Sequence, residues 1–293
     1  MEANNKTSTT PIDLKVLCCQ LKPKFKDIEH NIKRVEVSLA RYTEKDELDV
    51  ILFPEMCFTG YCFTSKEDIK PYTEEATKGK TFEYCASLAK KTNSYIMCGY
   101  PELYIDPETN KESFYNSAYV IDRQGNLVLN YRKHYLYETD HKWAEEGPSF
   151  QTVKLKNIKG IEYKAAVAIC MDINPYEFKN ENEVKLAEFC KKEQIDALFF
   201  LAAWLDSEPD KVDTGSIQRL INYWIMRLYP LIQDEKDKES YARKWAFFCS
   251  NRVGQEGETT FVGCTTALKF NPVELIGCLD KRHEGFLVAE VKL

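Results

Sequence analysis

The chain has 293 residues, a length that suits one large domain or two modest ones. Hydrophobic residues make up 44% and charged residues 29%, a balance typical of a globular protein in water. Lysine and arginine total 40 against 46 aspartates and glutamates, and the net charge of −6 argues against a protein that mainly binds nucleic acid.

The first twelve residues are predicted to form a flexible tail. Met1–Pro11 is polar and has neither an apolar centre nor an arginine, so we do not expect a secretory or typical mitochondrial leader. The longest apolar runs, such as residues 197–205, are far shorter than a membrane span. We therefore expect no membrane association and a cytoplasmic location, with a nuclear or mitochondrial pool as the alternative.

Short apolar runs rich in β-forming residues recur along the chain and predict strands. Several are continuously apolar, which is typical of interior strands covered on both faces. The predicted strands are Leu14–Cys19, Val50–Phe53, Tyr95–Gly99, Ser117–Ile121, Leu127–Tyr131, Ala165–Ile169, Ala197–Ala202, Ala246–Cys249, Thr265–Phe270 and Phe286–Val291.

Between these runs, apolar residues recur at helical spacing. Helices are predicted over Ile28–Leu39, Phe82–Ala89, Val184–Cys190 and Ile217–Leu228, the last ending near Pro230. Two strand patterns flank Arg123–Asn126 and predict an antiparallel hairpin. Strands that alternate with helices indicate an α/β protein, and no linker divides the chain, so a single domain over residues 13–293 is expected.

The chain contains eleven cysteines but no Cys-x-x-Cys spacing. A paired zinc-ligand signature and a thioredoxin-type motif are therefore both missing from the sequence. Free thiols in a reducing compartment, most of them small buried packing residues, are the simplest interpretation.

Three reactive side chains are predicted at strand ends. Cys170 closes an apolar strand, Glu55 follows another, and Lys133 ends the second strand of the hairpin. Singly, each has an ordinary structural explanation: a packing thiol, a helix cap or surface ion pair, and a strand-end lysine. Together they stand where α/β proteins usually assemble their sites, and burial would raise the pKa of Glu55 toward that of a useful base.

Each of the three residues stands in a longer motif: Pro54-Glu55-x-x-x-Thr59-Gly60-Tyr61, Tyr131-Arg132-Lys133-x-x-Leu136 and Ile169-Cys170-Met171-Asp172. In this order, the motifs resemble the signature blocks of the nitrilase superfamily of carbon–nitrogen hydrolases. Supporting blocks include Asn251-Arg252-x-Gly254 and Phe261-x-Gly263. The resemblance implies a single-domain, nitrilase-like α-β-β-α sandwich.

A closer resemblance is to the fungal-type amidohydrolases that act on N-terminal asparagine and glutamine. It is carried by residues 53–61, 98–102, 130–133, 169–176, 203–205 and 222–227, of which the last segment lies outside the general superfamily pattern. It implies deamidation of polypeptide N-termini bearing Asn or Gln, with release of ammonia, upstream of other N-degron enzymes. No cofactor or metal is implied, and the chain would be a monomer or a homodimer.

On this resemblance, Cys170 is the nucleophile and Glu55 the base that takes its proton. Lys133 and the backbone N–H of Met171 would hold the oxyanion. The superfamily often places a second acid a few residues after the lysine, and Glu138 and Asp140 both remain candidates for that position.

A substrate α-ammonium calls for a carboxylate in a desolvated pocket. The candidates are Asp140, Glu138 and Asp172, in falling order, and Asp172 is expected mainly to accept backbone hydrogen bonds near the nucleophile. Tyr61, Tyr137 and Trp204 are candidates for the pocket mouth, although aromatic residues at these positions would serve equally well in the core.

Two other functions remain open. One is a related amidase acting on a small free amide or N-carbamoyl compound, and the other is a catalytically silent scaffold. The complete set of Glu55, Lys133 and Cys170 argues against the scaffold. A Cys–His dyad with His134 is not favoured, because adjacent residues of a strand face opposite ways.

Overall fold

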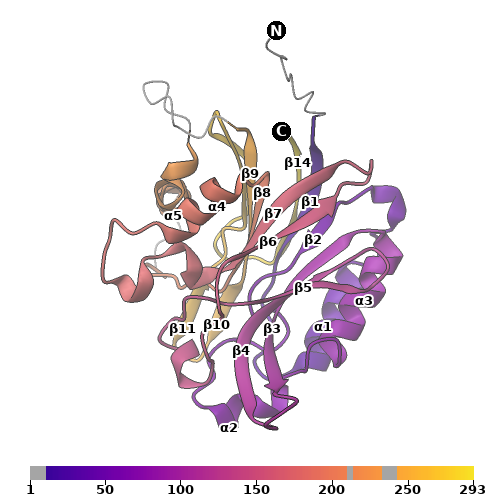
Figure 1. Cartoon of the computed structure of the whole chain (residues 1–293), viewed down its shortest axis with the longest axis vertical. Coiled ribbons are helices and arrows are strands. Elements are labelled where there is room, and N and C mark those ends of the chain that lie inside the picture. The colour runs from indigo at the N-terminus through magenta and orange to yellow at the C-terminus, as the bar shows by residue number, and fades with distance from the viewer. Residues whose placement is uncertain (1–10, 210–213, 233–242) are drawn as a thin grey trace.

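Two six-stranded sheets packed face to face form the centre of the computed structural model, and helices cover both outer faces (Figure 1). The structure describes residues 11–209, 214–232 and 243–293. Nearly all of the predicted N-terminal tail lies outside these ranges. No helix within them is long and apolar enough to cross a membrane.

The first sheet has the strand order β14-β1-β2-β3-β4-β5. Its three central strands, β1, β2 and β3, are mutually parallel, and the remaining neighbours pair antiparallel. Its strands are β1 (Asp13–Gln20), β2 (Val50–Leu52), β3 (Tyr95–Ile105), β4 (Glu112–Ile121), β5 (Leu127–Arg132) and β14 (Gly285–Lys292).

The second sheet has the order β13-β12-β9-β8-β7-β6, again with three parallel strands, β7, β8 and β9, at its centre. Its strands are β6 (Gln151–Lys156), β7 (Glu162–Ile169), β8 (Ala197–Ala202), β9 (Trp245–Asn251), β12 (Thr266–Phe270) and β13 (Glu274–Cys278). A separate two-stranded ribbon joins β10 (Val253–Glu256) to β11 (Thr259–Val262).

Two layers of helices complete the sandwich. Helices α1 (Ile28–Ser38) and α3 (Lys80–Thr92) cover the first sheet, and α4 (Lys185–Glu193) and α5 (Thr214–Arg227) cover the second. The side chain of Asp27 caps α1 by accepting from the backbone N–H of His30. The short helix α2 spans Lys66–Ile69. Single 3-10 turns span Glu44–Asp46, Lys70–Tyr72, Asp140–Lys142, Cys170–Ile173, Tyr176–Phe178 and Tyr229–Leu231.

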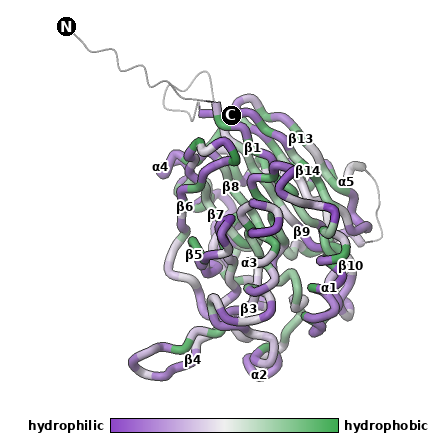
Figure 2. Tube along the Cα trace, turned by 90° about the vertical axis from the view of Figure 1, so that its right-hand side faces the viewer, coloured by the Kyte–Doolittle hydropathy of each residue, from purple (hydrophilic) through white to green (hydrophobic). Residues whose placement is uncertain are grey.

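Alternation along the central strands explains their continuous apolar runs. In β8, Phe199 and Leu201 face the layer between the two sheets, whereas Leu198 and Phe200 face α4 and α5. A strand covered on both sides must be apolar at every position. Figure 2 shows the same pattern, with hydrophobic strands inside and hydrophilic loops around them.

All ten predicted strands and four predicted helices are present, and so is the predicted β4–β5 hairpin. Strands β3 and β4 run well beyond their predicted ends. The prediction missed β6, β10, β11 and β13, because these are short or edge strands with several polar, partly exposed residues.

Candidate active site

The carboxyl ends of strands from both sheets meet at one place. Glu55 follows β2, Lys133 follows β5, and Cys170 directly follows β7 of the opposite sheet. The backbone of Ala203, just after β8, donates to Glu55 and so joins the two sheets at this point. Lys133 contacts Glu55, and the charges of both act on the Cys170 thiol, so the three predicted strand-end residues belong to one cluster.

Glu55 is completely buried and accepts three hydrogen bonds. Its Oε1 accepts from Lys133 Nζ and Asn116 Nδ2, both at 2.7 Å, and its Oε2 accepts from the Ala203 N–H at 2.8 Å. Burial raises the pKa of Glu55; the Lys133 charge lowers it without cancelling that effect, and the neighbouring Asp140 charge raises it further. A carboxylate with a raised pKa is a stronger base than an ordinary glutamate.

Close backbone packing sets the position of Glu55. A Cβ at Gly99 of β3 would lie 2.7 Å from the Glu55 Cα and 2.8 Å from the Met56 nitrogen. Only glycine at this position lets the Glu55 loop rest directly on the sheet.

Lys133 is also completely buried and lies between two carboxylates. Its Nζ is 2.7 Å from Glu55 Oε1 and 2.5 Å from Asp140 Oδ2. Burial lowers the pKa of Lys133, but the charges of Asp140 and Glu55 outweigh burial and leave the pKa raised. The ammonium has three donors, and these two partners leave one for an oxygen of a substrate.

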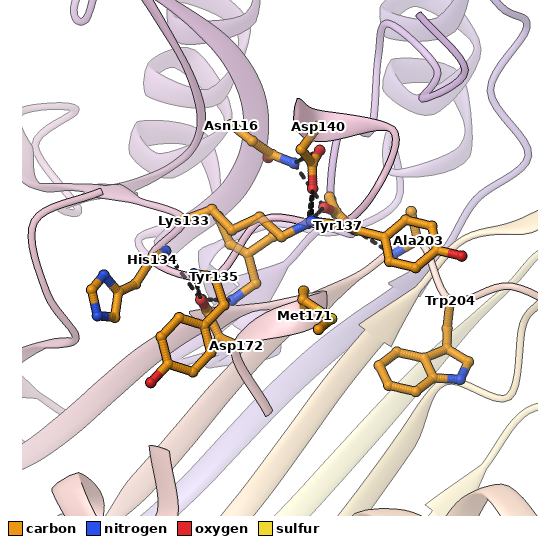
Figure 3. A network of polar contacts seen from close by, with 12 residues as sticks. Asn116, Lys133, His134, Tyr135, Tyr137, Asp140, Met171, Asp172, Ala203 and Trp204 are labelled. Carbon is orange, nitrogen blue, oxygen red and sulfur yellow. Dashed lines mark hydrogen bonds and ion pairs between the residues drawn. The ribbon is translucent and has the colours of Figure 1, made fainter. Parts of the chain in front are cut away.

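The second acid of the cluster is Asp140. Besides Lys133, it accepts from Asn116 Nδ2 at 3.0 Å and from the Tyr137 N–H at 3.0 Å, and it is fully buried (Figure 3). Glu138, the other candidate, is exposed. The shorter aspartate therefore holds the position beside the lysine.

Asn116 of β4 was missed in the sequence. Its amide nitrogen bridges Glu55 and Asp140, and so holds the two carboxylates around one lysine. A polar residue within a buried strand was the available signal, because such a residue needs a partner in the core.

Cys170 begins the 3-10 turn Cys170–Ile173 with a left-handed φ of 44°. A non-glycine residue in this conformation is strained, and such strain is common where a side chain must project into a site. Burial raises the pKa of the thiol, the Glu55 charge raises it further, and Lys133 and the Ala203 N–H lower it. The thiol is therefore protonated at neutral pH and needs a base to become a nucleophile.

Asp172 is part of this turn and links it to the neighbouring backbone. Its two oxygens accept from the N–H groups of Ile169, His134 and Tyr135 and from the Tyr131 hydroxyl, at 2.7–3.0 Å. With these contacts it acts as the predicted structural acceptor, and it does not line the pocket that opens onto Cys170. The prediction of a substrate-binding Asp172 is therefore not supported.

A pocket of about 180 Å³ opens onto Cys170. Its lining includes Tyr61, Tyr137 and Trp204, the predicted mouth aromatics. Neither Asp140 nor Glu138 lines it: Asp140 is occupied by Lys133, and Glu138 is exposed beside Tyr137. The full lining is Tyr61, Tyr137, Cys170, Met171, Asn174, Phe178, Ala203, Trp204 and Leu205.

His134 turns away from the cluster, as expected. Its Nδ1 is 2.8 Å from the carbonyl oxygen of Gly147, and Figure 3 shows its ring on the far side of Asp172 from Trp204. Within the described ranges, no group of three or more His, Cys, Asp and Glu side chains has the arrangement of a metal site.

The sandwich brings a buried carboxylate, a lysine and a thiol together at the strand ends, beside a small pocket. The chain belongs to the carbon–nitrogen hydrolase family, whose model matches residues 15–188. This match includes Glu55, Lys133 and Cys170 and ends before α5.

Two curated relatives are both named protein N-terminal amidase. The one from Schizosaccharomyces pombe is 30% identical over 298 residues, which cover 95% of this chain and all of that protein. The one from Saccharomyces cerevisiae is 36% identical over 214 residues, which cover 67% of this chain but only 46% of that protein. The chain thus spans about half the length of the budding-yeast relative.

A crystal structure of an N-terminal amidase superposes with a TM-score of 0.84 at 24% identity, covering 97% of this chain and 98% of that one. This likeness confirms the predicted nitrilase-like fold.

Proposed function

We propose that this protein removes the side-chain amide of an N-terminal asparagine or glutamine of a polypeptide and releases ammonia. The observation that carries the proposal is the end-to-end similarity to the S. pombe protein N-terminal amidase, combined with a buried cluster of Glu55, Lys133 and Cys170 under a small pocket. The similar crystal structures include complexes with Asn-Glu-Ala and Gln-Val peptides.

The contacts of the three side chains support the following chemistry. Glu55 takes the proton of the Cys170 thiol, and the sulfur attacks the amide carbon. The resulting oxyanion receives hydrogen bonds from Lys133 Nζ and the Met171 N–H. When the intermediate collapses, Glu55 returns the proton to the nitrogen. Ammonia departs, and a thioester on Cys170 remains. Glu55 then takes a proton from water, and the hydroxide attacks the thioester carbon. When this second intermediate collapses, Glu55 returns the proton to the sulfur, Cys170 is again a free thiol, and the carboxylic acid leaves.

The size of the pocket fits one amide side chain rather than a large ligand. At about 180 Å³ it is below the range of roughly 300–1,000 Å³ of pockets that enclose drug-sized molecules. The rest of the polypeptide would therefore lie outside, across the aromatic mouth.

The α-ammonium of the substrate would lie at that mouth. We place Glu138 first among its partners, because it is exposed and its charge acts on the hydroxyl of Tyr137, which lines the pocket. The faces of Trp204 and Tyr137 offer the ammonium a cation–π contact as well. Asp140 is the second candidate for binding the α-ammonium, because its oxygens already accept hydrogen bonds from Lys133, Asn116 and Tyr137.

The test compares ammonia release from an Asn-peptide, the same peptide with an acetylated N-terminus, and free glutamine. We expect the Asn-peptide to have the highest kcat/KM, and Glu138→Gln to lower it for that peptide alone. Equal or better turnover of the acetylated peptide or free glutamine would instead support an amidase for small or internal amides.

The product would begin with aspartate or glutamate. We infer that enzymes of the N-degron pathway that recognise acidic N-termini act on it next, in a reducing compartment such as the cytoplasm that keeps Cys170 a free thiol.

A further inference from the structure

Helix α5 reaches the active site from the outer face of the second sheet. It lies beyond residues 15–188, the part of the chain that the family model matches. At its last residue, Arg227 is only 4% exposed, and its guanidinium extends into the segment that follows the nucleophile. A buried guanidinium needs several acceptors, so its partners reveal what it holds.

The acceptors of Arg227 are backbone carbonyls on that segment. Nε donates to Ile173 at 3.0 Å, Nη1 donates to Glu181 at 3.0 Å, and Nη2 donates to Glu183. Ile173 is the last residue of the 3-10 turn that begins with Cys170. A single side chain thus ties the nucleophile turn to the loop that leaves it.

The turn needs support on this side. Cys170 has a left-handed φ, a conformation that persists only where the surroundings hold it. Asp172, which is part of the turn, links it to Tyr131 at the end of β5 and to the N–H groups of His134 and Tyr135 just after that strand, and also accepts from the N–H of Ile169 at the end of β7. Arg227 contacts the end of the same turn from the helical layer of the second sheet.

A second contact from α5 lies one helical turn earlier. The Tyr223 hydroxyl donates to Asn174 Oδ1, and Asn174 lines the pocket and places its Nδ2 3.3 Å from the sulfur of Met171. The N–H of Asn174 also donates to the Met171 carbonyl at 2.9 Å. Helix α5 therefore holds the backbone around Met171 through two side chains.

We propose that Arg227 is a positioning residue that keeps the Met171 N–H directed at the oxyanion. The inference rests on the proposed amide hydrolysis, since only a reaction at a carbonyl needs that N–H. Without Arg227, the turn would keep Cys170, Glu55 and Lys133 but lose the fixed direction of this donor. Stabilisation of the transition state would therefore be weakened, whereas binding of the substrate in its ground state would be unchanged.

The experiment measures two reactions of the same thiol in Arg227→Met and Arg227→Lys. The first is ammonia release from an Asn-peptide, analysed as kcat and KM. The second is modification of Cys170 by methyl methanethiosulfonate, followed by peptide mass mapping. In that reaction the sulfur of Cys170 forms a disulfide with the methylthio group and methanesulfinate leaves, so no carbonyl oxyanion is formed.

We expect Arg227→Met to lower kcat about tenfold, less than the loss of a whole oxyanion donor, with KM within about twofold. The modification rate of Cys170 should also stay within about twofold of wild type. Arg227→Lys keeps the charge and at least one donor, so its kcat should be intermediate. Arg34→Met is the control: Arg34 of α1 also donates to a backbone carbonyl, that of Lys22, and pairs with Glu284, but neither partner belongs to the site.

Three results would overturn the inference: an unchanged kcat in both Arg227 variants, a change in KM alone, or an equal loss of kcat and of the modification rate. If Arg227→Met does not fold, the same comparison is made with Arg227→Lys. Wild-type protein that releases no ammonia from Asn- or Gln-peptides would instead contradict the proposed function. In that case the ratio of kcat between each Arg227 variant and wild type is measured with any amide that the protein does hydrolyse.

Discussion

Cys170 and Cys57 are both buried thiols, but their surroundings differ in ways that matter for chemistry. Cys57 lies among apolar residues under α1 and α3, with its sulfur 3.4 Å from that of Cys98. Burial raises the pKa of Cys57 to about 11, and it raises the pKa of Cys170 as well. Acidity therefore does not separate the two.

The difference is that Cys170 has a base, a cation and an opening. The charges of Glu55 and Lys133 act on its thiol, and the pocket leads to it. Cys57 is 1% exposed, packs within an apolar cluster beside the Cys98 thiol, and no cation in the described part of the chain is among the groups that shift its pKa. On the proposed mechanism, a buried cysteine becomes a nucleophile through the proton acceptor and the anion-stabilising group beside it, and not through a low pKa of its own.

The largest effect is expected from Cys170→Ala. Without the sulfur no thioester can form, and kcat for ammonia release should fall by at least about a thousandfold. Thermal unfolding should show a folded protein, so that the loss can be assigned to chemistry. Activity above a tenth of wild type would mean that another group attacks the amide.

Lys133→Met should have the next largest effect. Losing an oxyanion donor costs about 10²–10³ in kcat, and leaving Glu55 and Asp140 buried without their cation should cost about 3 kcal/mol of stability. Urea unfolding measures the second effect. Adding Asp140→Asn to Lys133→Met should recover part of the stability but none of the kcat; a double variant as unstable as the single one would contradict this pairing.

Asp140→Asn should move the pH profile. Glu55 works as a base only when ionised, and its raised pKa places the acidic limb of kcat/KM above about 4.3, the value for an ordinary glutamate. The Asp140 charge contributes to that rise, so removing it should lower the pKa of Glu55 and shift the limb to lower pH. A limb that stays in place or moves up would show that Glu55 is not the group being titrated.

Cys57→Ala and Cys98→Ala should have the smallest effect on catalysis. Both should keep kcat within about twofold of wild type and lose about 1 kcal/mol of stability through the cavity that each leaves. A large loss of activity without loss of stability would mean that Cys57 or Cys98 takes part in the reaction.

The sequence predicted the central strands because a strand covered on both faces is apolar at every position, which leaves short, continuous apolar runs. It also predicted Glu55, Lys133 and Cys170 as one cluster, because strand ends in α/β sheets converge. Edge strands such as β6 were missed, since partial exposure removes the apolar signal.

The substrate-facing acids were harder to predict. Asp140, Glu138 and Asp172 are all carboxylates close to the motifs, and only their contacts show that one binds Lys133, one is exposed and one holds a turn. Asn116 and Arg227 were missed for a related reason: each acts through partners far away in sequence, such as Glu55 and Ile173.

The most direct test is to mix the enzyme with an Asn-peptide, quench with acid within the first turnover, and map the protein by mass spectrometry. We expect an adduct with the mass of the peptide less ammonia, carried on Cys170 and absent from Cys57 and Cys98. Ammonia release with no adduct on Cys170, or an adduct on another cysteine, would contradict it.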